Sequence, residues 1–466
     1  MNSQQLIDLG FAGSVLKHVF PQLQRMSAEG LSSRQMAGQL KRVLHHPHNF
    51  LNDAHFKELA RALVTGKPEV LFKERTEAAP WMQWGRGLEP EAVQQMARAC
   101  RLPISFRGAL MPDAHTGYGL PIGGVLATRQ AVIPYAVGVD IACRMKLSVL
   151  DMPLASLSQR QRELVSALEE ETAFGVGANF SSHPREHAVL DDDWEVVPVT
   201  KMSRDKARNQ LGSSGGGNHF AEFGELVLDE PQLGLEAGRY LAILTHSGSR
   251  GTGMAVANHY SKLAMDLHPE LPKDLSHLAW LDLASEAGQE YWHAMELMGR
   301  YASANHDCIH REVANHLGAE IIAGVENHHN FAWKETHFGE EVVVHRKGAT
   351  PAGPGVLGII PGSMASPAFV VRGRGNPDSL RSASHGAGRV MSRTKALQRF
   401  TWAEVKKQLD RAGVTLISSG LDEVPGVYKD IHEVMAAQQD LVEVLGVFHP
   451  RLVKMAPPGG RGRKRR

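Results

Sequence analysis

The chain has 466 residues, 42% of them hydrophobic and 22% charged, and its formal net charge is only +1. These values predict an ordinary globular protein whose net charge would not by itself attract a polyanion such as a nucleic acid. No segment is apolar for long enough to cross a bilayer. Cys100, Cys143 and Cys308 are too few for a disulfide framework and favour a reducing compartment, so the cytoplasm is the expected location.

Residues 1–80 are predicted to form a helical N-terminal extension. Met36, Leu40 and Val43 recur at the spacing of one helix face, so short amphipathic helices are expected. The neighbouring histidines are expected to form a surface cluster rather than a site; they are His45, His46 and His48.

Residues 81–455 are predicted to form the main domain, because glycine- and proline-marked turns begin near Trp81. Its strands and helices do not alternate cleanly, which argues against a doubly wound or barrel fold. The pattern predicts an α/β (α+β) fold of mixed, mainly antiparallel sheets with surrounding helices. Strands are expected over 240–245, 341–345 and 414–418, and helices after a capping box at Ser158, over 285–317 and over 430–445. Residues 456–466, rich in arginine and lysine, are expected to form a basic flexible tail.

Three glycine-marked turns each carry a histidine. Such turns let backbone N–H groups converge on an anion, and a nearby guanidinium suits phosphate oxygens. Together they predict a phosphate site built from loops. The three are residues 213–217 with Asn218 and His219, residues 247–253 with His246 and Arg250, and the segment around His385.

Asp140 and Cys143 are three residues apart, so one tight turn can aim both side chains at one point. Beside a metal ion Cys143 would be a thiolate, whose sulfur can bridge two ions. The alternative is a buried, inert cysteine, the commoner state of a lone cysteine, and the charged neighbours argue against it. Glu222 and Asp113 are candidates for holding a metal-binding histidine in place. Thiolate and imidazole ligands alone would favour Zn²⁺.

Other histidines are expected to lie at the surface or to cap helices. His306 and His310 have the spacing of a metal pair on a helix, but Cys308 between them would face away from both. The same interpretation applies to His183, His187 and His432. Trp292, Met295 and Met298 are expected to belong to the core.

Seven segments in order resemble the RtcB family of RNA-splicing ligases over roughly residues 90–454. They are 111–113, 139–143, 217–220, 246–251, 329–330, 360–364 and 384–389. The resemblance implies the family's own α/β architecture. It also implies GTP- and manganese-dependent joining of RNA 2′,3′-cyclic-phosphate or 3′-phosphate ends to 5′-hydroxyl ends.

The resemblance further implies a role for each matching residue. Cys143 would be shared by two Mn²⁺ ions, with Asp140 and His219 on one ion and His246 and His329 on the other. His385 would take GMP from GTP as the covalent nucleophile. Arg250 would contact an RNA phosphate, and Asp113 would support the site. The implied nucleotide-binding residues are Asn218, Glu222, His329, Asn330, Ser363, His385, Gly386, Ala387, Gly388, Tyr428 and Lys454.

Two departures from the family pattern bear on this assignment. Arg144 follows the cysteine where the family usually has glycine, and could narrow the approach of metal or RNA. The chain continues beyond Lys454, where the family typically ends, which puts that residue's role in doubt. Two other functions stay open: a metal-dependent nucleotidyltransferase or phosphodiesterase that acts on RNA ends without sealing, and a non-enzymatic RNA- or metal-binding protein. The natural RNA, a splicing or a repair role, and the oligomeric state are not indicated by the sequence.

Overall fold

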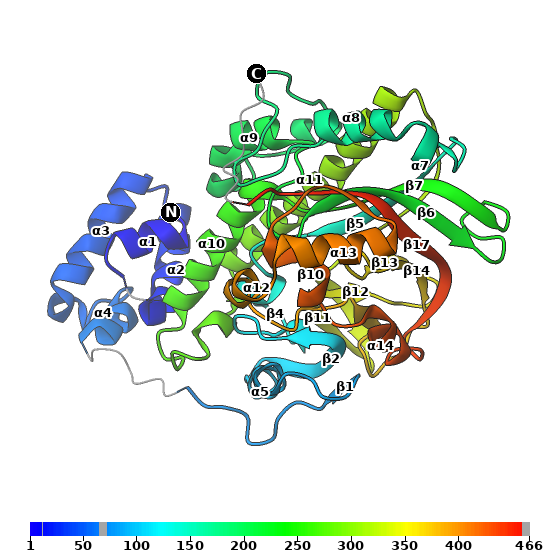
Figure 1. Cartoon of the computed structure of the whole chain (residues 1–466). Coiled ribbons are helices and arrows are strands. Elements are labelled where there is room, and N and C mark those ends of the chain that lie inside the picture. The colour runs from blue at the N-terminus through cyan, green and yellow to red at the C-terminus, as the bar shows by residue number, and fades with distance from the viewer. Residues whose placement is uncertain (12, 65–71, 459–466) are drawn as a thin grey trace.

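Two sheets form the centre of the protein (Figure 1), whose computed structural model describes residues 1–11, 13–64 and 72–458. The larger sheet has the strand order β13-β14-β17-β6-β7-β5-β9, with β16 beside β17. All of its pairs are antiparallel except β16 with β17, which confirms the prediction of mainly antiparallel sheets. Its strands are β5 (Arg144–Leu150), β6 (Phe220–Leu228), β7 (Gly238–Ser247), β9 (Ile321–His328), β13 (Leu357–Pro361), β14 (Ala368–Gly373), β16 (Thr415–Ser418) and β17 (Val442–Met455).

The smaller sheet has the order β1-β2-β3-β11-β10. A cluster of buried side chains from both sheets, including Val125, Val344 and Phe369, packs them together. Its strands are β1 (Trp81–Gln83), β2 (Ser105–His115), β3 (Ile122–Thr128), β10 (Asn330–His337) and β11 (Glu340–Lys347). Two short pairs complete the strands: β12 (Ala349–Pro351) with β15 (Ser382–Ser384), and β4 (Ala131–Val132) with β8 (Leu281–Asp282).

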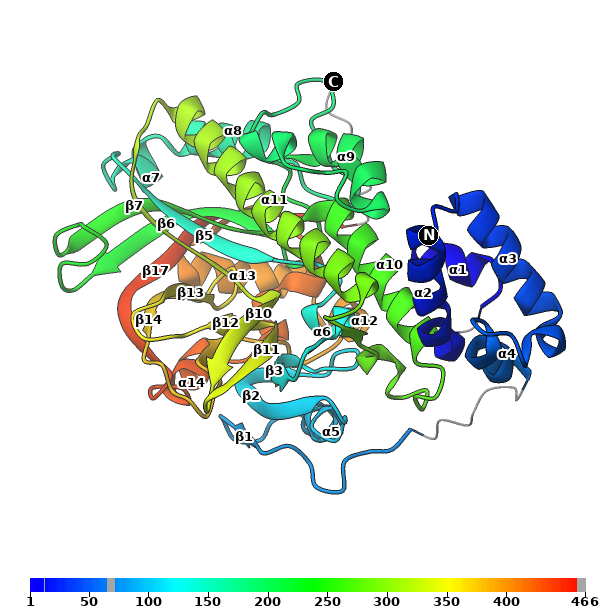
Figure 2. The same cartoon turned by 180° about the vertical axis from the view of Figure 1, so that it is seen from behind.

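Helices α8 (Gln161–Glu171) and α11 (Glu286–Leu317) cover one face of β5, β6 and β7, as Figure 2 shows for α11. Along β7, Leu241 and Ile243 face these helices, whereas Ala242 and Leu244 face the opposite cluster. The period-two alternation of a strand therefore sends His246 to the side away from α11. This is the side on which the site lies.

The other elements connect and flank the sheets. Helix α10 (Arg250–Leu267) follows β7 directly, and α5 (Pro90–Ala99) packs on β2 through Met96. The remaining helical segments are α6 (Pro134–Val137), α7 (Ser156–Gln159), η2 (Ala188–Asp191), α9 (Pro198–Gln210), η3 (Ser276–Leu278), α12 (Arg393–Arg399), α13 (Trp402–Ala412), η4 (Leu421–Glu423), η5 (Pro425–Val427) and α14 (Ile431–Ala436).

The N-terminal segment forms short helices with a core of their own, made by Leu6, Val19 and Leu40 among others. Leu267, the last residue of α10, packs against this core, so the segment lies beside α10 (Figure 1). Its histidines His45, His46 and His48 are exposed, as predicted. The helices are α1 (Ser3–Asp8), α2 (Gly13–Ala28), α3 (Ser33–His45), η1 (Pro47–Phe50) and α4 (Lys57–Val64).

Two predicted helix boundaries are wrong. The helix expected over 430–445 ends at Ala436, and β17 begins at Val442. The strand prevails because β-branched side chains such as Val444 and Val447 pair with β14 and β6. The capping box at Ser158 is absent: its hydroxyl donates to the Ala155 carbonyl, and a separate helix begins at Gln161.

The strands expected over 240–245, 341–345 and 414–418 and the helix expected over 285–317 are confirmed by β7, β11, β16 and α11. Among the described residues, no helix combines the length and apolar character needed to cross a membrane. Most of the predicted basic tail, from residue 459 onward, lies outside the described residues.

Candidate metal and nucleotide site

Cys143 lies at the end of a turn between α6 and β5. Its N–H donates to the Asp140 carbonyl at 3.2 Å, and the N–H of His329 donates to the Cys143 carbonyl at 3.0 Å. The preceding Ala142 has φ +56°, so the backbone is bent sharply just before the cysteine. This turn carries Asp140 and Cys143 to one place, as their spacing predicted.

The start of α10 is tied to the same turn. Ser249 donates its hydroxyl to the Ile141 carbonyl at 2.6 Å. Gly248 allows this approach, because a Cβ there would lie 2.3 Å from the Asp140 carboxylate. The expected glycine turn over 247–253 is therefore shorter than predicted, since α10 begins at Arg250.

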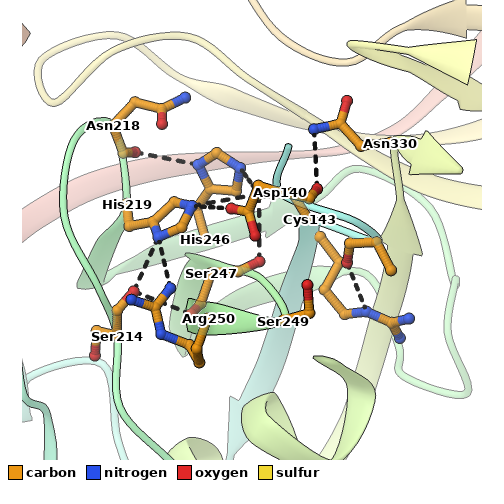
Figure 3. Close-up of polar contacts among 12 residues, drawn as sticks. Asp140, Cys143, Ser214, Asn218, His219, His246, Ser247, Ser249, Arg250 and Asn330 are labelled. Carbon is orange, nitrogen blue, oxygen red and sulfur yellow. Dashed lines mark hydrogen bonds and ion pairs between the residues drawn. The ribbon is translucent and has the colours of Figure 1, made fainter. Parts of the chain in front are cut away.

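Two histidines from neighbouring strand ends point at the sulfur of Cys143. The Nε2 atoms of His219 and His246 lie 3.4 and 3.0 Å from Sγ. Asp140 joins this group, with its Oδ2 2.9 Å from Nε2 of His219 (Figure 3). All four side chains therefore meet around one point.

The ring hydrogen bonds fix which nitrogens carry protons. Nδ1 of His219 lies 3.0 Å from the Ser214 carbonyl, and Nδ1 of His246 lies 3.1 Å from the Asn218 carbonyl. A carbonyl accepts only, so Nδ1 of His246 donates and its Nε2 presents a lone pair to the sulfur. His219 differs, because its Nδ1 also faces the Arg250 guanidinium and its Nε2 donates to the Asp140 carboxylate. A lone pair, a sulfur and a carboxylate that converge in this way suit a cation between them.

His329 extends the cluster. Its Nε2 lies 3.2 Å from Nε2 of His246, and its buried Nδ1 has no hydrogen-bond partner among the described atoms. Cys143, His219 and His246 by themselves already have the mutual spacing of a metal site. With Asp140 and His329 added, the donor set fits divalent metal ions.

The electrostatics of the buried cluster agree with this interpretation. Burial and then the Asp140 carboxylate raise the pKa of the Cys143 thiol well above its ordinary value. Burial would raise the pKa of Asp140 too, but the hydrogen bond from His219 outweighs it and holds the pKa at about 2. The thiol therefore stays protonated in this cluster unless a cation neutralises the sulfur.

His385 stands next to this cluster. Its ring centroid lies 5.0 Å from that of His329, and its Nδ1 lies 2.6 Å from Oδ2 of Asp113. Burial would raise the pKa of Asp113, but the hydrogen bond to His385 lowers it below its ordinary value. Asp113 is thus a carboxylate that accepts Nδ1–H, which leaves Nε2 of His385 with a free lone pair.

The segment after His385 packs closely on Asp113. Gly388 has φ +75°, and a Cβ on it would lie 2.0 Å from the Asp113 carbonyl. The glycine is therefore required by both its backbone angle and the lack of space. This contact holds the nucleophile candidate and its carboxylate together.

A cavity of about 720 Å³ opens beside His385, His246 and His329. Residues from both sheets line it. Predicted site residues that line it as well are Asn218, Glu222, Ser363, Gly386, Ala387, Gly388 and Tyr428. Glu222 has no hydrogen bond or ion pair among the described residues, and burial raises the pKa of its carboxyl well above the ordinary value.

Three residues predicted to contact nucleotide or RNA do not line this cavity. Lys454 points to the opposite face of β17, where its Nζ donates to the carbonyls of Leu168, Glu169 and Thr172. Arg250 packs against the metal-ligand candidate His219, with Nη1 3.2 Å from Nδ1 (Figure 3). The Asn330 amide donates to the Asp140 carbonyl and accepts from the N–H of Gly348, so it braces the cysteine turn.

Sequence reasoning missed several residues that line the cavity. His115, two residues after Asp113, lies in a segment that was already singled out, and that proximity was the available signal. Glu423 accepts from the Tyr428 hydroxyl and from Arg389 and Arg393. No motif marks Glu423, because only the fold brings η4 against the segment after His385.

The interpretation of His306 and His310 as surface residues is wrong, since both are fully buried beneath β7. Both rings contact the Thr245 hydroxyl at 2.7 Å, and Nε2 of His306 lies 3.2 Å from the Ser247 carbonyl. They support the strand that carries His246. Cys308 does face away, toward the Glu186 carbonyl, as predicted.

The other histidine and core predictions are confirmed. His183 and His432 are exposed, and His187 caps η2 by accepting from the N–H of Val189. Trp292, Met295 and Met298 are buried core residues.

Arg144 does not narrow the cavity. Its guanidinium pairs with Glu326 and donates to the Gly299 carbonyl of α11 at 3.0 Å, whereas Nε reaches the Ala142 carbonyl. Burial would raise the pKa of Glu326, but Arg144 is the main group that holds it at about 2. Arg144 therefore fixes the cysteine turn to α11 from behind.

Replacing Arg144 with alanine should lower the free energy of unfolding by about 3 kcal/mol, because it leaves a largely buried carboxylate with less compensation. Denaturant unfolding measures this, with Lys201→Ala as a control in an exposed pair. Since the folded pKa of Glu326 lies below the ordinary 4.5, its stabilisation is present above about pH 5 and is lost toward pH 2. The difference between wild type and variant should shrink over the same range; a difference independent of pH would contradict this pairing.

Comparison with known proteins gives a consistent result. The family model described as tRNA-splicing ligase RtcB matches residues 95–455. RNA-splicing ligase RtcB of Escherichia coli strain K12 is 37% identical over 405 residues, which cover 79% of this chain and 96% of that protein. RNA-splicing ligase RtcB homolog 2 of Entamoeba dispar is 28% identical, covering 94% of this chain and 93% of its own length. The tRNA-splicing ligase RtcB of Methanococcus maripaludis is 30% identical, with 80% and 91% covered.

Proposed function

The chain belongs to the RtcB family and is an RNA ligase, and from that premise we propose that it joins RNA 2′,3′-cyclic-phosphate or 3′-phosphate ends to 5′-hydroxyl ends. The proposed reaction uses GTP and passes through a covalent bond between His385 and GMP. One observation carries the proposal: a histidine with a free Nε2, held by a buried carboxylate, lines one cavity together with the candidate metal ligands His246 and His329.

His385 is the proposed nucleophile. Its Nε2 attacks the α-phosphorus of GTP, an N–P bond forms, and the bond to the leaving pyrophosphate breaks. The ring gains positive charge as the bond forms, and the Asp113 carboxylate at Nδ1 stabilises that charge. Asp113 thus also fixes the tautomer that keeps Nε2 available.

The two later steps return His385 to its free state. A cyclic-phosphate end must first be opened by water to a 3′-phosphate and a 2′-hydroxyl. An oxygen of the RNA 3′-phosphate then attacks the bound GMP phosphorus and breaks the N–P bond. The 5′-hydroxyl of the second RNA then attacks the activated 3′-phosphorus, and GMP leaves. Asn218, Ser363 and Tyr428 line the cavity where the nucleotide would be held.

Cys143, Asp140, His219, His246 and His329 are the proposed ligands of two Mn²⁺ ions, with the sulfur shared. Bound divalent ions would neutralise phosphate charge and stabilise the oxygens that enter and leave. The residues fit such a pair because the sulfur lies between His219 with its Asp140 partner and His246, and His329 adds a donor beside His246.

The proposed function assigns a part to each segment of the chain. Residues 81–455 would form the catalytic domain, residues 1–80 a helical extension, and residues 456–466 a basic tail. Lys454 is left out of the nucleotide pocket, because its ammonium lies on the other face of β17. Arg250 retains its proposed contact to an RNA phosphate only if it leaves its present position against His219. The proposed location is the cytoplasm.

A joining assay tests this function. One RNA fragment with a 3′-phosphate or cyclic-phosphate end and one with a 5′-hydroxyl end are incubated with the protein, GTP and Mn²⁺. We expect a joined product that depends on both GTP and the metal. Capping or hydrolysis of the 3′ end without joining would instead identify a nucleotidyltransferase or phosphodiesterase.

A further inference from the structure

An aromatic cluster stands at the mouth of the cavity. The Tyr118 side chain is 68% exposed, although Gly117 and Tyr118 both line the cavity. Its ring centroid lies 6.3 Å from that of Tyr135 and 5.7 Å from that of His277, and the last two lie 4.6 Å apart. The cluster of Tyr118, Tyr135 and His277, here called the aromatic rim, has no role in the proposed chemistry.

The loop that presents Tyr118 is held in place by polar contacts on both sides. Gln95 donates to the Gly117 carbonyl at 2.7 Å and accepts from its N–H at 3.0 Å. Glu89 accepts from the N–H of Thr116 at 2.8 Å. The Tyr118 carbonyl accepts from Nζ of Lys347 at 2.6 Å. The exposed ring is therefore held out on a fixed backbone, which lowers the entropy cost of stacking on it.

Lys347 lies beneath the rim, where burial lowers the pKa of its amine to about 7. Its Nζ lies 5.3 Å from the centre of the Tyr135 ring, and it has no carboxylate partner among the described residues. Lys429, which donates to the carbonyls of Pro112 and Ala114, adds a second amine at the base of the same loop. Aromatic rings beside basic groups are typical of surfaces that bind single-stranded nucleic acid.

A protein partner fits this surface less well. Protein interfaces need a broad apolar patch, whereas Tyr118 is the only exposed large hydrophobic side chain of residues 112–135 and 273–283. One exposed ring beside a cavity proposed to hold phosphates matches the size of one base. The ring also adjoins the cavity directly, so a base on it would be continuous with an RNA end inside.

We propose that Tyr118 stacks on an unpaired base of an RNA end whose terminal phosphate or hydroxyl enters the cavity. The aromatic rim is then a binding subsite for single-stranded RNA, which rests on the proposed joining function. Tyr135 and His277 brace the Tyr118 ring edge-on and tilted, which holds it ready for stacking.

Binding of short fluorescent single-stranded RNAs tests the subsite by anisotropy, separately for a 3′-phosphate and a 5′-hydroxyl oligonucleotide. Tyr118→Ala should weaken binding of one or both about tenfold, and Tyr118→Phe should stay within about twofold of wild type, because stacking needs the ring and not the hydroxyl. Phe338→Ala, which removes an exposed ring at the β10–β11 turn, is the matched control and should leave affinity unchanged.

An abasic nucleotide moved along the oligonucleotide locates the stacked base. At one position it should weaken binding to wild type about tenfold and have no further effect on Tyr118→Ala. The proposal would be overturned if the abasic nucleotide weakened binding equally in wild type and Tyr118→Ala at every position, or if Tyr118→Ala bound RNA with wild-type affinity. The aromatic rim would then be a candidate contact for a protein partner. Because binding is read without joining, a wild-type protein that binds but does not seal RNA would count against the proposed function and not against this subsite.

Discussion

His385→Ala should take no GMP from GTP and should fail to join RNA. Nε2 of His385 is the only protein atom proposed to bond to phosphorus, and Asp113 already occupies the other ring nitrogen. Removing a nucleophile of this kind lowers turnover by a factor of about 10³ or more. Incubation with GTP labelled in the α-phosphate, followed by denaturing electrophoresis, measures the covalent product, which should be labile to acid.

Two variants give this prediction its controls. His432→Ala removes an exposed histidine outside the cavity and should label like wild type. Asp113→Asn keeps the ring but offers a poorer acceptor to Nδ1–H, so labelling should be slowed by roughly 10²-fold and not abolished. Label retained at full yield by His385→Ala would show that another residue carries the GMP, whatever the activity of the protein.

The sequence was most informative where a motif lies within one turn. The Asp140–Cys143 spacing predicts their convergence, because a single bend aims both, and the ends of β6 and β7 lie side by side once their pairing is antiparallel. The sheets were also predictable in kind, since strands such as 240–245 are β-rich runs with no helix alternating between them. The kind of fold and the convergence at Cys143 therefore followed from local patterns, whereas cavity residues such as Ser363 and Tyr428 came only from the resemblance to the family.

Side-chain direction was not predictable in the same way. Lys454 and its neighbour Val453 face opposite sides of β17, and only Val453 lines the cavity. The sequence also does not show that Arg144 would find Glu326 on β9, 182 residues away, and turn from the cavity. His306 and His310 carried the pattern of an exposed helix face but lie under β7, because α11 is buried on several sides. In each case the direction of the side chain is set by a contacting residue that lies far away in the sequence.

Replacing Cys143 with alanine should remove both bound metal ions together. The sulfur lies near both groups of proposed ligands, 3.4 Å from Nε2 of His219 and 3.0 Å from Nε2 of His246. Without the sulfur, each proposed ion keeps only two protein ligands. The negative charge of the thiolate is also lost, which leaves the Asp140 carboxylate as the one anionic ligand of the proposed set. Metal content after dialysis against Mn²⁺ is measured by elemental analysis, and calorimetric titration gives the affinity.

The control for this variant is Cys308→Ala, because Cys308 is also buried but its sulfur faces the Glu186 carbonyl. It should keep the wild-type number of ions, so any loss in Cys143→Ala cannot be assigned to losing a buried thiol as such. Two ions bound at wild-type affinity by Cys143→Ala would contradict a shared sulfur. Loss of one ion alone would show that Cys143 binds a single metal. That metal would then be the one held by His219 and Asp140 or the one held by His246 and His329. Variants of His219 and His329 would distinguish the two cases.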